Sequence, residues 1–208
     1  MLSDIDLLGT EYGGTCSDKV LHFQKVLSAN GIHAQLHSAW INDHRCHRLL
    51  TTEIDSQKYF IDVGSGWPIL QLIPAFKSIR FSVFGMTFET VQSDEEIHLF
   101  HKTKDEFKLM VRIPIESQSE SQIIDEINNR FIDKSIYPFE KSIRFSKIAD
   151  ESFVFLKGNR LRTFGSRDFQ EQILSEAEIL NFLAHQMSLN DTPAKLRNAL
   201  RSSIAKLH

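Results

Sequence analysis

A cysteine, a histidine and an aspartate have the types and the spacing that covalent catalysis needs. Cys16 follows two glycines and adjoins an amphipathic stretch, residues 17–29, which predicts a helix. Unpaired N–H groups and the dipole at a helix N-terminus stabilise a thiolate, the nucleophilic form of cysteine. A thiolate needs a base, and the base needs an orienting carboxylate. His47 and Asp62 suit these two tasks, so the sequence predicts a Cys16–His47–Asp62 catalytic triad.

Three short segments after the helix predict an antiparallel meander that would position the histidine and the aspartate. They are rich in alternating or β-branched residues, as strands are, and span residues 32–41, 45–54 and 57–63. Ser17 or Asp18 would cap the start of the preceding helix, and Asn30-Gly31 would end it.

The second and third of these strands form a hairpin around Asp55-Ser56. If Thr52 faces Gln57, residues 53–56 make the loop, and His47 lies directly opposite Asp62. Opposite residues project from one face with Cβ atoms roughly 4.5–5.5 Å apart, within reach of an imidazole–carboxylate hydrogen bond. A shift of one residue would place the two side chains on different faces.

Other interpretations of these residues stay open. Asp62 would instead cap the turn at Gly64, with His47 an ordinary strand residue. His44 is a second candidate base, although it lies at the edge of its strand. Strand alternation places Cys46 on the face opposite His47, so Cys46 is not expected in the same site.

Two kinds of ligand site are conceivable around the hairpin. In the segment Asp62–Gly66, the glycines permit backbone N–H groups to point at an anion, and a plain strand-ending turn is the alternative. A metal is not expected, because the nearby histidines and cysteine lack strong zinc-ligand spacings: His33, His37, His44, Cys46 and His47.

Composition excludes several classes of protein. The chain has 208 residues, 41% of them hydrophobic and 25% charged, which is typical of a globular protein. Only two cysteines occur, so a disulfide scaffold is excluded and two free thiols are expected. The net charge of -3 gives no footprint for nucleic acid or an anionic membrane. No apolar segment is long enough to span a bilayer and the start lacks a secretory signal, so a cytoplasmic protein is expected.

The remainder of the chain predicts an α+β fold. Strand-like pieces fill residues 79–115, a polar connector follows, and residues 123–132 have helical periodicity. Further strands follow between residues 142 and 165. Two helices close the chain, at 175–186, where Ser175 and Glu178 form a capping box, and at 192–207. The expected parts are a helix and meander with the triad, a β-barrel-like domain and a helical tail, at residues 1–66, 67–170 and 171–208.

Several separated segments together resemble the arylamine N-acetyltransferase family. They follow the order of that family's Gly-Gly-x-Cys segment, its histidine strand with Asp-Val-Gly-x-Gly, its middle domain and its closing helix. The segments are 13–20, 47–66, 125–148, 153–162 and 175–189. The joint occurrence of Cys16, His47 and Asp62 makes the resemblance more specific than any single segment.

The resemblance implies a fold and a reaction. The fold would be a transglutaminase/papain-like core, with a cysteine-bearing helix on an antiparallel sheet, an antiparallel β-barrel and C-terminal helices. Cys16 would accept an acyl group from acetyl-CoA or another acyl-CoA, with no metal, and pass it to a small-molecule amine or hydroxyl acceptor. Three residues would lie near the pyrophosphate or pantetheine of the coenzyme: Gly64, Ser65 and Gly66.

The sequence also departs from that family. Only 15 residues precede Cys16, where the family has a helical domain, so part of the cleft wall is expected to be missing or to be supplied by a partner subunit. The exposed apolar surface expected of a shortened fold favours self-association. Thr15 and Ser17 replace the aromatic residues beside the cysteine, and Asp18 replaces a glutamate. Two rival functions follow: a thiol amidase, peptidase or transglutaminase-like enzyme with the same triad, or a non-catalytic binding module.

Overall fold

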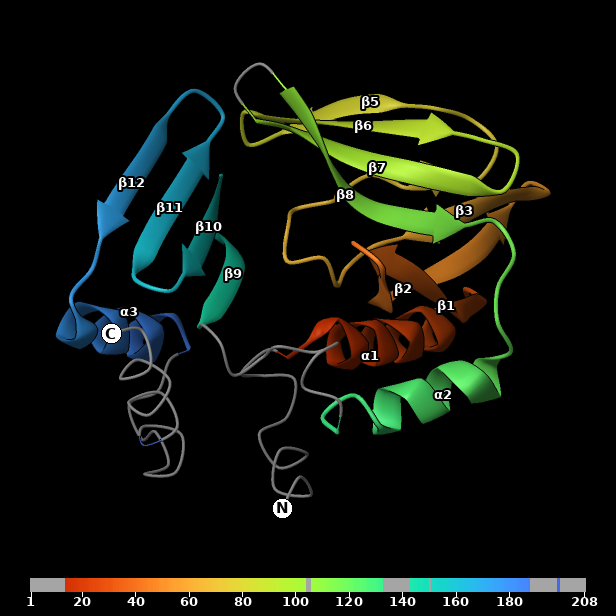
Figure 1. The fold of residues 1–208 in the computed structure, drawn as a ribbon, viewed down its shortest axis with the longest axis horizontal. Coiled ribbons are helices and arrows are strands. Elements are labelled where there is room, and N and C mark those ends of the chain that lie inside the picture. The colour runs from red at the N-terminus through yellow and green to blue at the C-terminus, as the bar shows by residue number, and fades with distance from the viewer. Residues whose placement is uncertain (1–13, 104–105, 133–142, 150, 188–197, 199–208) are drawn as a thin grey trace. The chain divides into compact units, whose positions relative to one another are not determined.

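The computed structural model describes residues 14–103, 106–132, 143–149, 151–187 and 198, and these have the predicted α+β composition. The chain divides into two compact units, residues 1–137 and 138–208. Each unit has its own antiparallel sheet (Figure 1). The three-part division expected from the sequence stays a prediction, although strands from its first two parts join in one sheet.

Within its described residues, the first unit contains two helices and an eight-stranded antiparallel sheet that curls into a half-barrel (Figure 1). The order across the sheet is β4-β3-β2-β1-β8-β7-β6-β5. Its two halves meet where Trp40 on β1 pairs with Arg112 on β8. The elements are α1 (Cys16–Ala29), β1 (Ala34–Ile41), β2 (His44–Ile54), β3 (Gln57–Ile61), β4 (Ile73–Pro74), β5 (Arg80–Val83), β6 (Met86–Gln92), β7 (Glu96–Thr103), β8 (Glu106–Pro114) and α2 (Glu120–Asn128).

Helix α1 begins one residue earlier than the sequence suggested, so Cys16 is its first residue. The predicted caps, Ser17 and Asp18, are wrong: the N-cap is Thr15. The reason is that Asp18 folds back, and its Oδ2 accepts hydrogen bonds from the Thr15 N–H at 2.8 Å and the Thr15 hydroxyl at 2.6 Å. Its Oδ1 accepts from Arg130 at 2.7 Å, just beyond α2. One carboxylate therefore fixes the start of α1 and ties it to α2.

Replacing Asp18 with alanine is expected to lower the free energy of unfolding by about 1–3 kcal/mol, because the variant loses both the cap and the ion pair. Urea unfolding followed by circular dichroism measures this. Lys25→Ala, on an exposed position of the same helix, is the control and should shift stability by less than about 0.5 kcal/mol. Equal stability of the two variants would contradict a structural role for Asp18.

Helix α2 is displaced from the predicted span of residues 123–132. It begins earlier because Ser119 caps it in a capping box with Gln122. It ends at Asn128 because two side chains satisfy its last carbonyls: Asn129 donates to Asp125 and Arg130 donates to Ile127.

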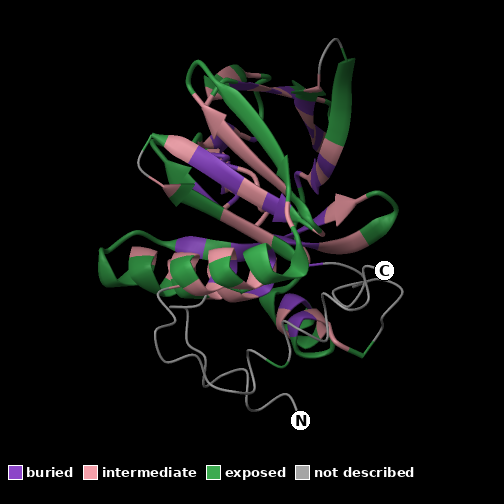
Figure 2. Ribbon diagram, turned by 90° about the vertical axis from the view of Figure 1, so that its left-hand side faces the viewer, coloured by how far each residue is buried: buried purple, intermediate pink, exposed green. Residues whose placement is uncertain are grey.

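The core of the first unit forms where α1 and α2 cover one face of β1 and β2. Val20, Leu36, Leu50, Ile123 and Ile127 are buried together there. On β2, residues 47–52 are all buried, so both faces of this strand are covered. Figure 2 colours the ribbon by the burial of each residue. The strand that carries the predicted base is therefore held from both sides.

The register of the β2–β3 hairpin differs from the prediction by two residues. Thr52 pairs with Tyr59 rather than Gln57, and the loop is only Asp55-Ser56. Both loop residues have positive φ, 51° and 59°, which is the geometry of a two-residue hairpin turn. The direct opposition of His47 and Asp62 is therefore wrong. A two-residue shift nevertheless preserves the face from which each side chain projects.

The described part of the second unit contains a four-stranded antiparallel sheet and a helix that precedes residue 188. Its elements are β9 (Arg144–Ala149), β10 (Ser152–Lys157), β11 (Arg160–Gly165), β12 (Phe169–Ile173) and α3 (Glu176–Gln186). The predicted capping box of Ser175 and Glu178 is present at the start of α3. The sequence analysis missed β12, whose residues are all exposed and have no apolar face to mark them. The expected helix at 192–207 lies outside the described residues except for residue 198.

Candidate active site

The Cys16 side chain lies against a free edge of β2. β3 pairs with β2 only from Leu50 onward, so no strand within the described ranges pairs with the preceding residues of β2 on that side. There the Cys16 sulfur lies 3.7 Å from the carbonyl oxygen of Cys46, and the backbone N–H of Arg48 donates to it. In an extended strand these two backbone groups point the same way. The first side chain of α1 thus takes the place of the missing strand.

His47 and Asp62 form a buried pair beside this edge. The Nε2 atom of His47 lies 3.0 Å from Oδ2 of Asp62, and both side chains are almost fully buried. The imidazole also hydrogen-bonds the Cys16 thiol. Because Nε2 is engaged by Asp62, Nδ1 is the nitrogen available to the sulfur. The structure therefore brings together the three residues selected from the sequence, with the imidazole between thiol and carboxylate.

Asp62 also has the second role considered from the sequence. Its Oδ1 accepts hydrogen bonds from the backbone N–H groups of Gly64, at 3.0 Å, and Ser65, at 2.9 Å. This turn explains why β3 ends at Ile61, before the predicted boundary at residue 63. The two interpretations are compatible because each uses a different carboxylate oxygen. The turn fixes the carboxylate that faces His47.

Gly64 makes the close approach of α1 possible. A Cβ atom at this position would lie 2.7 Å from the Cβ and 2.9 Å from the Cα of Cys16, and 3.0 Å from the carbonyl oxygen of Arg48. If the hairpin register continued past Ile61, Gly64 would stand opposite His47. Because Gly64 has no side chain, Cys16 can occupy the space beside it.

The charges of the cluster are strongly coupled. Burial alone would raise the pKa of the Cys16 thiol, but the hydrogen bond and charge of His47 and the nearby Arg48 hold that pKa below its ordinary value. Burial alone would lower the pKa of His47, but Asp62 and Cys16 raise it to about 10. Burial would raise the pKa of Asp62, but His47 and the turn N–H groups lower it. The cluster therefore favours the charged form of all three groups, the thiolate, the imidazolium and the carboxylate.

Alkylation by iodoacetamide is expected to distinguish the two cysteines by pH. The rate at Cys16 should reach its plateau at a lower pH than that of an ordinary thiol, because the Cys16 pKa is lowered. The pKa of Cys46 is raised, first by burial and then by the charge of Cys16, so its rate should still be rising above pH 8.5, the ordinary thiol pKa. Peptide mapping of alkylation between pH 5 and about 10 checks this. A common pH profile for both thiols would contradict it.

Two cations at this site were not selected from the sequence. Lys19, one helical turn after Cys16, is partly buried, and its pKa is lowered by burial despite the opposing charges of Cys16 and Asp62. Arg48 is 1% exposed, donates to the carbonyl oxygen of His47 at 2.9 Å and bonds Glu126 of α2 at 2.6 Å. Lys19 could have been identified from the sequence, because residues three apart on a helix lie on the same face, and Lys19 is three residues after Cys16. The pairing of Arg48 with α2 depends on tertiary structure.

The alternative sites are placed elsewhere or are not formed. His44 is exposed at the start of β2 and does not join the cluster. Among the described residues, no three His, Cys, Asp or Glu side chains gather as metal ligands would. None of the helices within the described ranges is long and apolar enough to cross a membrane.

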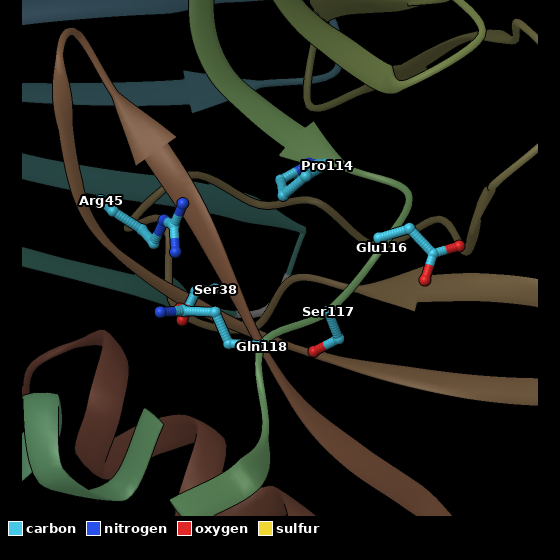
Figure 3. A pocket seen from close by; sticks show the side chains of 6 residues that line it. All are labelled: Ser38, Arg45, Pro114, Glu116, Ser117 and Gln118. Atoms are coloured by element: carbon cyan, nitrogen blue, oxygen red, sulfur yellow. The ribbon is translucent and has the colours of Figure 1, made fainter. Parts of the chain in front are cut away.

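A separate cavity of about 240 Å³ opens between the β1–β2 hairpin and the connector that leads to α2 (Figure 3). Its lining residues are Ser38, Arg45, Pro114, Glu116, Ser117 and Gln118. Three buried polar atoms of this lining have no hydrogen-bond partner among the described residues: Ser38 Oγ, Arg45 Nε and Gln118 Oε1. A polar cavity of this kind accommodates water. The three residues of the thiol cluster do not line it.

The structure places a thiol, an imidazole and a carboxylate in one cluster, and comparison with known proteins shows the family of the chain. A model of the N-acetyltransferase family matches residues 5–195, so the chain belongs to this family. No curated protein sequence matches the chain.

Solved structures of arylamine N-acetyltransferases share the fold. The Mycobacterium marinum enzyme in complex with CoA has a TM-score of 0.78 at 15% identity, over 94% of this chain and 76% of that one. The Salmonella typhimurium enzyme has a TM-score of 0.73 at 15% identity, over 90% and 75%. A Bacillus cereus enzyme, described as having a unique Cys-His-Glu triad, has a TM-score of 0.67 at 17% identity, over 84% and 72%.

Proposed function

We propose that this protein is an acyltransferase that carries an acyl group on Cys16, with acetyl-CoA or another acyl-CoA as donor and a small amine or hydroxyl compound as acceptor. The observation that carries the proposal is the buried cluster in which His47 contacts both the Cys16 thiol and the Asp62 carboxylate. Membership of the N-acetyltransferase family and a fold shared with a CoA-bound arylamine N-acetyltransferase support it.

The proposed reaction is a two-step transfer. The Cys16 thiolate attacks the thioester carbonyl, a new thioester forms on Cys16, and the coenzyme leaves as a thiol that takes a proton from His47. His47 then removes a proton from the acceptor as the acceptor attacks the acyl-enzyme, the bond between the acyl carbon and the Cys16 sulfur breaks, and Cys16 leaves as a thiolate. The backbone N–H of Cys16 at the start of α1 is suited to the oxyanion. Asp62 holds the imidazole and stabilises its charged form through the 3.0 Å contact.

We propose that the turn of Gly64, Ser65 and Gly66 forms the wall of the site on which the coenzyme arm lies. Gly64 touches Cys16, so this turn lies beside the reacting sulfur. The N–H groups of Gly64 and Ser65 are already engaged by Asp62. The turn would therefore contribute to coenzyme binding through its shape, which lets the coenzyme arm come close to the backbone. These two N–H groups would not donate hydrogen bonds to phosphate.

Intact mass spectrometry after incubation with acetyl-CoA and a series of longer acyl thioesters tests the proposal. The wild-type chain should gain one acyl group, which identifies the preferred donor, and Cys16→Ala should gain none. A wild-type chain that gains no mass although Cys16 alkylates quickly would favour an enzyme that cleaves amides. No mass gain together with a slowly alkylated Cys16 would favour a non-catalytic binding module.

The acceptor requires a second measurement. Aromatic amines, aliphatic amines and alcohols are added to the isolated acyl-enzyme, and the loss of acyl mass is followed with time. Faster loss with an aromatic amine than with the others would support an arylamine acceptor. We also propose a cytoplasmic location, which agrees with two free thiols.

A further inference from the structure

Arg48 is a buried cation beside the candidate active site, and the proposed reaction gives its side chain no task. It follows His47 on β2, and only 1% of its surface is exposed. Its backbone N–H donates to the Cys16 sulfur, whereas its side chain bonds Glu126 of α2. A buried charge is costly unless it is paired and hydrogen-bonded. The contacts of this guanidinium therefore show what the charge is held for.

The part of β2 just before Arg48 is irregular. The pairing of β1 with β2 shifts by one residue there, so that a single residue of β1 faces two residues of β2, Arg45 and Cys46. Such a β-bulge interrupts the ladder of hydrogen bonds and is common beside active sites. The carbonyl oxygen that lies 3.7 Å from the Cys16 sulfur belongs to the bulged residue Cys46. Because the ladder is interrupted, other contacts must fix the direction of these backbone groups.

The guanidinium of Arg48 supplies those contacts. Its Nη1 donates to the carbonyl oxygen of Arg45, at 3.2 Å, and to that of His47, at 2.9 Å. These two carbonyls belong to the residues on either side of Cys46. One side chain therefore spans the bulged segment, residues 45–47, from its first residue to its last.

Helix α2 is the anchored end of this link. The carboxylate of Glu126 accepts from Arg48 at 2.6 Å through Oε2, and from Gln118 in the connector before the helix at 3.0 Å through Oε1. The helix itself is held in the core by its buried side chains Ile123 and Ile127. A planar guanidinium donates in several fixed directions at once, which the point charge of a lysine does not do. The link can therefore fix a direction as well as a distance.

We propose that Arg48 is a positioning residue, whose guanidinium links the bulged segment of β2 to α2 and so holds the backbone groups around Cys46 against the Cys16 sulfur. The imidazole of His47 belongs to the same segment and is held with them. The guanidinium acts through the strand and is assigned no contact with substrate. This inference deepens the proposed function and rests on Cys16 as its nucleophile.

Arg48→Met tests the proposal, because methionine has a long side chain without a charge or a hydrogen-bond donor. Single-turnover acylation with acetyl-CoA, iodoacetamide alkylation of Cys16 against pH, and urea unfolding are measured on the full chain. Acylation per folded molecule should slow by about a hundred-fold, because the sulfur and its partners lose their alignment. The alkylation profile should move to higher pH, because the charge of Arg48 helps to lower the pKa of Cys16. The other charged groups of the cluster, His47, Asp62 and Lys19, are unchanged in this variant.

Three further variants separate positioning from folding. Arg48→Lys keeps the charge but not the fork, so its alkylation profile should stay closer to wild type while its acylation slows by about ten-fold. Glu126→Ala removes only the α2 end of the link. It should slow acylation in the same direction, and it decides the question if Arg48→Met fails to fold. Arg80→Met, which breaks an exposed ion pair with Glu89 in the same unit, is the matched control and should react like the wild type.

Two results would overturn the proposal. One is an Arg48→Met chain of lower stability that, corrected for its folded fraction, acylates and alkylates like the wild type, since the role would then be structural only. The other is a Glu126→Ala chain with the wild-type acylation rate and alkylation profile. If no acyl-CoA acylates the wild type, a shifted Cys16 profile in Arg48→Met would retain the positioning role while acyl transfer fails. An acylated wild type with an unchanged Arg48→Met would retain acyl transfer while the positioning role fails.

Discussion

Replacing His47 with glutamine is expected to slow acylation of Cys16 by about a thousand-fold or more. Glutamine retains a polar group of similar size but cannot take up a proton or carry a positive charge. The Cys16 thiol then loses the partner that offsets its burial, so its pKa should rise. Single-turnover acylation with acetyl-CoA at pH 7, followed by mass spectrometry, measures the effect.

The pH dependence separates loss of the base from loss of the fold. In the wild type, the acylation rate should be nearly constant above the lowered pKa of Cys16. In His47→Gln the rate should keep rising with pH, because each increase ionises more of a thiol that lacks an imidazolium. His44→Gln is the matched control, since His44 is exposed on the same strand, and it should react like the wild type. If His44→Gln were the slower variant, His44 would be the base.

Replacing Gly64 with alanine is expected to slow acylation by about a hundred-fold, although no reacting atom is removed. The added methyl group would lie 2.7 Å from the Cβ of Cys16 and 3.0 Å from the carbonyl oxygen of Arg48, so α1 or the turn must move. Such a shift would separate the sulfur from His47 and loosen the turn that fixes Asp62. Overpacking of this kind is also expected to cost about 1–3 kcal/mol in the free energy of unfolding.

Gly31→Ala provides the contrast. Gly31 has a φ of 75°, and a Cβ atom there would meet nothing within 4 Å. Its replacement should cost stability through backbone strain, about 1 kcal/mol, but leave the acylation rate within about two-fold of wild type. Acylation rates and urea unfolding are compared for the two variants. The comparison distinguishes the effect of crowding Cys16, expected for Gly64→Ala, from the effect of backbone strain, expected for Gly31→Ala. An active Gly64→Ala chain of normal stability would show that the tight contact is not required.

Local patterns in the sequence were sufficient for several features. The amphipathic stretch after Cys16 predicted α1, and Ser175 with Glu178 predicted the start of α3, because a capping box depends on residues close in sequence. The α+β class followed from the distribution of such local signals. The exposed strand β12 escaped detection because it lacks the apolar alternation on which strand prediction depends.

In the β2–β3 hairpin the predicted loop was wrong, but the predicted contact between His47 and Asp62 is present. The sequence suggested a loop of residues 53–56, but Asp55 and Ser56 adopt positive φ and close it in two residues. His47 and Asp62 are therefore not directly opposite each other. They still share a face because the shift is even, and the turn after Ile61 directs the carboxylate to the imidazole.

By itself the sequence determined the chemical types available to this site, namely a thiol at a helix start, an imidazole on a strand and a carboxylate before a glycine turn. Tertiary structure decided how they meet, because long-range packing sets distances that local propensity does not encode. The entry of Cys16 at the free edge of β2, the space left by Gly64 and the link from buried Arg48 to Glu126 all join segments far apart in the chain. Burial then makes the pKa values of the site residues depend on the charges and hydrogen bonds around them. Those neighbours are close in space but not in sequence.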